Sequence, residues 1–241
     1  MKNWVIKSIN SLSTLAVILT LTGCGASVPL MVRQPVVYSY NEPQSGKVDV
    51  ILGVLGSSFA DQAQISYRSL GYQSQSVREF ISAFDKNFYD LMITKGINTL
   101  GPFNGYQDMT YPDKKNSDLL VEPVLNFVFS VQKIEAQSQW SAVGTTYQIS
   151  IGGSLDLVIY EPLSQVKMWM KKINLKGDVK NITIILGKDN NNYGIGIDNV
   201  YSAMLVDFFN SSFPRISKYF NAEELAMLKK QSQELRAKKV Y

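Results

Sequence analysis

The residues that point most directly to a chemical step are Leu21-Thr22-Gly23-Cys24, which hold the only cysteine in a chain of 241 residues. A segment with two lysines and an apolar run over residues 12–21 precede them. This order of a basic segment, a short apolar segment and small residues is that of a secretory signal. The Leu-x-Gly-Cys ending predicts cleavage between Gly23 and Cys24. The thiol would carry a diacylglyceryl group, and the freed amine would be acylated, as by palmitate.

Several acyl chains on one residue would hold the protein stably at a membrane. A single chain gives only marginal binding, at ~0.8 kcal/mol per buried methylene. The apolar run is shorter than the ~20 apolar residues that a membrane-spanning helix needs. We therefore expect residues 1–23 to be a lipoprotein signal peptide rather than a hydrophobic N-terminal helix. Gly25 is not the inner-membrane retention aspartate of enteric bacteria, which favours a lipid anchor in the outer membrane.

The sequence has few residues suited to other kinds of catalytic chemistry. Histidine is absent, so the usual general base near neutral pH and the commonest zinc ligand are both missing. Glu122, Asp156 and Glu161 could form an acid–base pair, but their spacing does not require it, and most carboxylates lie at the surface. With Cys24 lipidated, neither a disulfide nor a free thiol is left. We expect a protein that is not an enzyme and that binds no metal or cofactor.

Three short motifs each lack a residue that their chemistry needs. Residues 189–194 begin like a calcium loop, but Tyr193 occupies a ligand position and Val200 stands where a bidentate glutamate is required. Gly194-Ile195-Gly196 lacks the third glycine of a dinucleotide-binding turn, and residues 53–58 lack the lysine of a phosphate-binding loop. The first segment is interpreted as a polar loop. None of the three predicts a ligand.

The charge balance does not favour a nucleic-acid partner. The formal net charge is +4, but Lys2 and Lys7 lie in the predicted signal, so the mature chain keeps a net charge of +2. Such a balance implies no obligate polyanion. The basic residues between positions 229 and 239 could contact anionic lipid headgroups. Because three glutamates dilute that charge, a solvated helix face is the favoured interpretation.

The mature chain divides into a tether and one folded body. Residues 24–46 have no clear period and contain three prolines, so we expect a lipidated tether with a short strand over residues 36–40. Residues 47–241 are a normal length for a single domain with one core. At its start, the mostly apolar run of residues 47–54 predicts a buried strand.

The first predicted helix has the clearest start and end signals. It begins at a capping box of Ser76 and Glu79, and it ends at Lys95 and Gly96, which suit the negative end and the left-handed cap. Apolar residues at helical spacing predict a stripe that packs in the core. The stripe consists of Val77, Phe80, Phe84, Phe88 and Leu91.

Two more helices are predicted near the end of the chain. The first has Asp198 as its N-cap and a broad apolar face, and it must end or kink at Pro214, which lacks a backbone donor. The second begins at Asn221, where Glu224 completes a capping box. Its C-terminal half is charged and is expected to face solvent.

The middle of the chain predicts antiparallel strands. After a loop over residues 101–115, one long strand is expected over residues 119–135. Its apolar residues do not keep one register, which predicts either a bulge or an asymmetric environment. Alternation over residues 145–151 is interrupted at Gly152-Gly153, and a hairpin follows over residues 154–175. The order of elements favours an α+β fold. We expect an antiparallel or mixed sheet, with a central β-meander and about three helices packed on it.

Several segments resemble one bacterial family. They are the lipobox, Lys114-Lys115 before Leu119-Leu120-Val121, the turn Tyr160-Glu161-Pro162-Leu163-Ser164, and the ending from Tyr201 to Lys239. Together they resemble the Helicobacter neuraminyllactose-binding hemagglutinin lipoproteins, also called flagellar sheath adhesins. The stretch from Ala222 to Lys238 is particularly similar. The resemblance covers most of the mature chain, which looks like a divergent paralogue within this family.

The resemblance implies a surface adhesin of the outer membrane or flagellar sheath that binds sialylated host glycoconjugates. The family's proposed sugar-binding segment corresponds to residues 132–138, where Lys133 keeps a positive charge and Glu135 adds a negative one. Because a sialic acid carboxylate needs cationic donors, Lys133 and nearby Trp140 are the candidate glycan-binding residues. A strand-end lysine and a core tryptophan are the competing interpretation.

Two other function classes remain open at this stage. One is a structural or assembly lipoprotein of the envelope or the flagellar sheath, which would contact protein partners without binding sugar. The other, an envelope enzyme, has the weakest support because the chain has no histidine.

Overall fold

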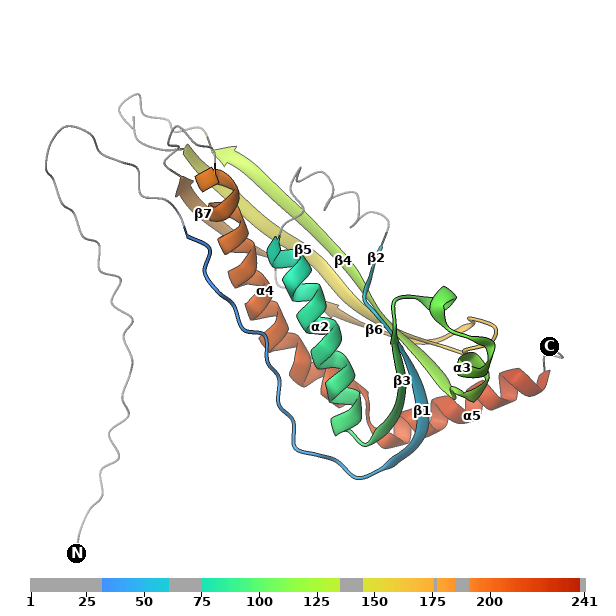
Figure 1. Ribbon diagram of the computed structural model, residues 1–241. Helices are drawn as coiled ribbons and strands as arrows, with labels where there is room; N and C mark the ends of the chain where they lie inside the picture. Colours follow the sequence, from blue (N-terminus) through green and yellow to red (C-terminus); the bar gives the residue numbers. More distant parts are fainter. Residues whose placement is uncertain (1–31, 61–74, 135–144, 176, 185–190, 239–241) are drawn as a thin grey trace, which may run out of the picture.

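The computed structural model describes residues 32–60, 75–134, 145–175, 177–184 and 191–238. The elements in chain order are β1 (Val48–Leu55), β2 (Ser58–Phe59), α2 (Gln75–Thr94), β3 (Ile97–Phe103), the 3-10 helix η1 (Tyr106–Asp108), α3 (Tyr111–Asn116), β4 (Leu119–Ile134), β5 (Thr145–Tyr160), β6 (Lys167–Asn174), β7 (Asp178–Ile184), α4 (Asn191–Tyr219) and α5 (Ala222–Lys238) (Figure 1).

The strands form one seven-stranded mixed sheet. Its main path is β3-β1-β4-β5-β6, in which β1 runs parallel to β3 and β4, and β5 runs antiparallel to β4 and β6. β2 lies beside β4, and β7 pairs with the first half of β5 while β6 pairs with the second half. The predicted α+β class, with a mixed sheet and a β4-β5-β6 meander, is confirmed.

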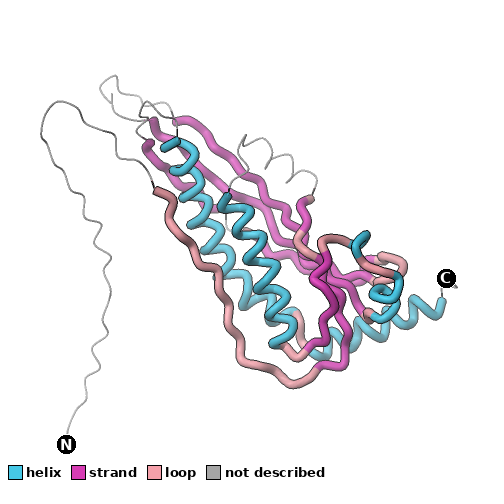
Figure 2. Tube along the Cα trace, viewed as in Figure 1, coloured by secondary structure: helices cyan, strands magenta, loops and turns pink. Residues whose placement is uncertain are grey.

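The core lies between one face of the sheet and the helices α2, α4 and α5 (Figure 2). Phe80 of α2 packs 5.9 Å from Phe127 of β4, and Phe84 packs 5.3 Å from Phe213 of α4, measured between ring centroids. The whole predicted stripe of α2 is buried, so that prediction is confirmed. A smaller core of Leu55, Met109 and Leu120 lies on the other face.

The loop predicted over residues 101–115 is wrong. It contains the end of β3, an edge strand paired only with β1 in the described sheet, and all but the last residue of α3. β3 has few buried residues, so it lacks the apolar pattern of a central strand. The start of α3 did have a sequence signal: Thr110 and Asp113 form a capping box, with a proline in the first turn.

Of the two alternatives for β4, the bulge is wrong and the asymmetric environment is confirmed, and the predicted break in β5 is wrong. The β4–β5 register runs without a shift from Leu120↔Tyr160 to Ile134↔Thr146. This register requires a glycine at position 153. The φ of Gly153 is +110°, and a Cβ there would lie 1.8 Å from the Asn126 carbonyl oxygen. The apolar residues of β4 do not alternate strictly, because core residues pack against both faces of this strand.

The predicted start of α2 is correct to within one residue but Ser76 is not its cap, and the predicted start of α4 at Asp198 is wrong. α2 already includes Gln75, and the Ser76 hydroxyl donates to the carbonyl of Asp198 rather than capping its own helix. Asp198 lies inside α4, which begins at Asn191 and continues through Pro214 to Tyr219. In both cases the polar side chain serves a contact between helices, which local sequence signals do not reveal.

The start of α5 is correct, although its capping box is only half formed. The amide of Glu224 donates to Asn221 Oδ1 at 2.8 Å, as an N-cap requires. The Glu224 carboxylate accepts from Trp169 Nε1 at 2.6 Å instead of from the cap backbone. Within the described residues, no helix is both long and apolar enough to cross a membrane.

Candidate functional site

Of the residues predicted to carry lipid or glycan, only Lys133 lies in the described part of the chain. Gly23, Cys24 and Trp140 lie outside it. Lys133 is exposed near the end of β4, where it pairs with Tyr147 of β5. The structure therefore places the candidate cation at the free end of the long β4–β5 pair, and it leaves the pairing with Trp140 a prediction.

A pair of tyrosines lies beside Lys133. The Tyr147 ring makes an edge contact with Tyr193 of α4, with centroids 4.9 Å apart. Burial and the neighbouring Tyr147 raise the pKa of Tyr193, so the ring stays neutral at physiological pH. We call this end, formed by residues 132–134, residues 145–147 and Tyr193, the tip. Sequence reasoning missed both tyrosines because their contact joins distant parts of the chain.

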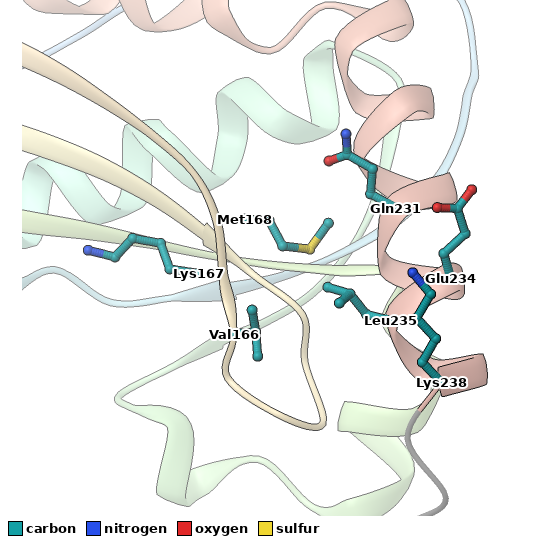
Figure 3. Close-up of a pocket in the computed structure, with 7 residues that line it drawn as sticks. All are labelled: Val166, Lys167, Met168, Gln231, Glu234, Leu235 and Lys238. Carbon is teal, nitrogen blue, oxygen red and sulfur yellow. The ribbon is translucent and has the colours of Figure 1, made fainter.

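A second candidate surface lies at the opposite end of the molecule. There a cavity of about 260 Å³ opens between the start of β6 and the last turns of α5 (Figure 3). Apolar atoms of Val166, Met168 and Leu235 face one another, while Lys167 points away from α5 (Figure 3). We call this cavity the α5 groove. The residues that complete its lining are polar: Gln231, Glu234 and Lys238.

A buried ion pair fixes α5 at this end. Arg236 Nε donates to Glu161 Oε1 at 2.7 Å, and the Glu161 side chain is 0% exposed. Glu161 also accepts from the amides of Leu163 and Ser164. Burial opposes its charge, but the bonds from Ser164 and Arg236 outweigh that and lower the pKa of Glu161. The other guanidinium nitrogens reach carbonyls beside α3, including that of Ser117 at 2.6 Å.

Residues 32–46, which we call the strap, lie along α2 and α4 outside the sheet (Figure 1). This is the described part of the predicted tether, and the strand expected over residues 36–40 is not formed. Its residues do alternate between half-buried and exposed, as in a strand. Because the strap lies on helices, helix groups rather than a neighbouring strand bond its backbone. Near its end the amide of Ser45 donates to the carbonyl of Thr94 at 2.9 Å, and elsewhere side chains make the bonds.

Two asparagines provide those bonds. Asn87 of α2 accepts from the amide of Tyr40 at 3.1 Å and donates to the carbonyl of Tyr38 at 3.4 Å. Asn199 of α4 accepts from the amide of Gln34 and donates to the carbonyl of Val32, both at 3.1 Å. Each side-chain amide thus replaces one step of a β-ladder.

An arginine anchors the beginning of the strap. Arg33 makes a bidentate pair with Glu79 of α2, with both N–O distances 2.7 Å, and its Nε donates to Asp198 of α4 at 2.9 Å. The bond from Arg33 lowers the pKa of Glu79, against some desolvation. Because Arg33 joins both helices at once, it fixes where the strap starts.

The end of the strap has a second polar anchor. Glu42 accepts from Ser217 of α4 at 2.5 Å, from Tyr40 at 2.9 Å and from Lys95 at 3.3 Å. Burial raises the pKa of Glu42, but these three bonds outweigh it and the net pKa is lowered. Between the anchors, Tyr38 packs 5.3 Å from Phe209, and burial raises the pKa of Tyr38 to about 12. The sequence patterns placed Lys95 at a helix end and residues 36–40 in a short strand, but they gave no sign that these residues meet Glu42 and Ser217.

The carboxylates considered for acid–base chemistry each have a structural partner. Glu161 pairs with Arg236, Asp156 accepts from Asn126 and Ser154, and Glu122 accepts from Ser58. Within the described ranges, no group of histidine, cysteine or acidic residues could hold a metal ion.

A Helicobacter pylori protein described as a homolog of neuraminyllactose-binding hemagglutinin has a similar crystal structure. The TM-score is 0.55 with 12% sequence identity, covering 80% of this chain and 97% of that chain. The two chains share a fold. Rare lipoprotein B from Shewanella oneidensis gives a TM-score of 0.34 with 5% identity, covering 69% of this chain and 95% of that chain, and it supports no inference. No protein-family model matches the chain, and no curated protein matches it by sequence.

Proposed function

We propose that the protein is a lipid-anchored lipoprotein of the outer membrane or flagellar sheath, and that it is an adhesin for sialylated glycoconjugates. The lipobox at Cys24, on a chain that shares its fold with the Helicobacter protein described above, carries this proposal. The proposal has two parts, an anchor and a ligand, and each is tested separately.

The anchor is tested by replacing Cys24. Cys24→Ser removes the only thiol that could be lipidated, so the variant should leave the membrane fraction of expressing bacteria. Mass spectrometry of the wild-type N-terminal peptide should find an acylated cysteine as the first residue. A wild-type protein that keeps residues 1–23, or that carries no lipid, would exclude a lipoprotein.

Two exposed places are candidates for the glycan. At the tip, Lys133 is exposed and pairs across the strands with Tyr147, which contacts Tyr193. In the α5 groove, Lys238 lies at the edge of an apolar floor. A cation next to an aromatic or apolar surface suits a sugar acid, which offers a carboxylate and a ring face.

The ligand is tested with a soluble body that begins at Gly25. Its binding to sialylated and matched neutral glycans should be compared for Lys133→Ala, for Lys238→Ala and for the control Lys218→Ala, an exposed lysine of α4. The proposal expects sialic acid-dependent binding that one of the first two variants weakens and the control preserves. Absence of binding at millimolar sialoside would exclude the lectin function.

A specific observation favours the alternative, a structural or assembly lipoprotein that contacts proteins. Val128, Met170 and Val179 are 52%, 47% and 57% exposed. Their strand partners place all three on the sheet face opposite the main core. Exposed apolar residues gathered on one face are typical of protein contacts. Crosslinking in intact cells would support this function if the partner is lost in Val128→Lys and kept in Met227→Lys on α5.

We also propose that the protein has no catalytic activity. The absence of histidine and the structural partners of the three candidate carboxylates support this. A hydrolase screen with glycoside and ester substrates would overturn it if activity fell in Glu122→Gln while the protein stayed folded.

A further inference from the structure

We propose that the strap turns the body so that the tip faces the membrane that holds Cys24, and the α5 groove faces away from it. This inference rests on the lipid anchor of the proposed function and not on sugar binding. Of the two glycan candidates, it leaves the α5 groove facing outward and turns Lys133 toward the membrane. It follows from where the strap is fixed, how much chain precedes that point, and what the two ends of the body present.

The strap is fixed close to the tip. Its first anchor, Arg33, is bound to Asp198, which lies in the second turn of α4, and the tip tyrosine Tyr193 lies in the first turn. The other end of α4 is far away: from Asp198 to Tyr219 the helix extends about 32 Å at 1.5 Å per residue. Tyr219 packs beside Trp169, next to α5. Arg33 therefore lies at the end of the body that carries the tip. Figure 1 shows the start of the strap beside the first turns of α4.

The length of chain before Arg33 limits its distance from the membrane. Eight residues separate Cys24 from Arg33, so the chain between them spans at most about 30 Å. Without the strap contacts, the first fixed residue would be Val48 at the start of β1, up to about 80 Å from Cys24. Val48 is next to Asp49, whose carbonyl accepts from Lys229 of α5 at 2.8 Å. Releasing the strap would thus move the attachment point to the opposite end of the body.

The tip has side chains that suit a lipid headgroup surface. Lys133 is exposed, Ile134 is 38% exposed, and Tyr147 and Tyr193 are half-buried. Lysine is attracted to anionic headgroups, and tyrosine is enriched where apolar chains meet water. Two basic residues of α5 are less available, because Arg236 is bound to Glu161, and Lys229 to Asp49 and Asp118. Lys230 and Lys238 are exposed, but they have no tyrosine pair like that of the tip beside them among the described ring contacts.

The orientation can be measured with the full lipidated protein in vesicles of phosphatidylcholine with one-fifth phosphatidylglycerol. Cys24 is the only cysteine, and in the lipidated protein its thiol carries the diacylglyceryl group, so one introduced cysteine can be labelled selectively. Gln132→Cys places a fluorophore at the tip, and Met227→Cys places one on α5; both positions are exposed. A lipid-borne headgroup quencher should reduce the Gln132 signal several-fold more than the Met227 signal. Equal quenching, or the reverse, would overturn the proposal.

The strap is tested on the same two labelled proteins. Adding Arg33→Met should reduce quenching at position 132 and increase it at position 227, while the matched control Arg215→Met, an exposed arginine of α4, should change neither. An unchanged ratio in a folded Arg33→Met protein would show that the strap does not set the orientation. Circular dichroism checks the fold of each variant.

Failure of the anchor gives a different result from failure of the orientation. If the purified protein carries no lipid by mass spectrometry, both the proposed lipoprotein and the orientation are wrong. If it is lipidated and vesicle-bound but the two labels are quenched alike, only the orientation is wrong.

Discussion

Two arginines fix segments at opposite ends of this molecule. They differ in how deeply their carboxylate partners are buried and in which segment they attach. Arg33 binds Glu79 and Asp198 across two helices, and the Glu79 side chain is 43% exposed. Arg236 binds Glu161, which is 0% exposed, together with carbonyl groups beside α3. The first attaches a segment outside the sheet, whereas the second holds α5 against the turn between β5 and β6.

The difference in burial predicts a difference in cooperativity. A carboxylate removed from water cannot lose its partner without a large cost, so the Arg236 pair should unfold only with the whole body. A half-exposed pair regains water when it opens, so the strap can detach while the sheet and its helices stay folded.

Removing Arg236 should destabilise the whole protein. In Arg236→Met the apolar stem remains, but Glu161 keeps a buried charge without its guanidinium partner, next to the hydroxyl of Ser164 and the amides of Leu163 and Ser164. The free energy of unfolding should fall by about 3–5 kcal/mol. Urea unfolding followed by circular dichroism measures it, with Lys238→Met as the control on the same helix. A loss as small as that of the control would show that the two arginines do not differ.

The effect of Arg236→Met should depend on pH. Because the folded-state pKa of Glu161 lies below its unfolded value of 4.5, its ionised form stabilises the fold. That stabilisation is complete above the unfolded pKa and is lost as the pH falls through the folded pKa. The difference between wild type and variant should therefore be largest near neutral pH and shrink below about pH 4.5. A difference that stays constant on acidification would contradict the assigned role of the Glu161 charge.

Features that depend on a local, periodic pattern could be predicted from the sequence, whereas features that depend on long-range polar contacts could not. Phe80, Phe84 and Phe88 follow a helical period because they meet a continuous core, and that pattern was sufficient to place α2. Ser76 and Asp198 have the chemistry of helix caps, but they bond to each other across 122 positions. Local patterns give no information on such partners.

The same limit applies to the candidate sites. Arg33 lies in a stretch with the composition of a tether, and its partners are 46 and 165 positions away. Tyr147 and Tyr193 meet only after β5 and α4 have docked. The capping box at Thr110 and Asp113 is different: its signal was present in the sequence, and the helix α3 could have been predicted from it.

Removing Arg33 should release the strap with a small cost to the body. For Arg33→Met we expect a loss of about 1 kcal/mol in the free energy of unfolding, because the pair is partly exposed to water. Cleavage within residues 32–46 by a protease should become much faster than in wild type. Arg215→Met is the matched control. A loss of about 3 kcal/mol or more, on the order expected for a buried pair, would remove the contrast.

Raising the salt concentration should weaken the exposed Arg33 pair and leave the buried Arg236 pair almost unchanged. This is the smallest effect that we expect. Exposed charges are screened at ionic strengths where the Debye length falls to about 3 Å, near 1 M, whereas buried pairs are screened much less. Proteolysis of the strap should therefore speed up in wild type as sodium chloride rises, and it should change little in Arg33→Met, which has already lost the pair. Hydrogen exchange at the amides of Leu163 and Ser164, which bond to Glu161, should stay slow throughout. The opposite order would contradict the contrast. If exchange at Leu163 and Ser164 became faster at a lower salt concentration than cleavage of the strap did, the buried pair would be the weaker of the two. The strap would then not be the part that detaches first.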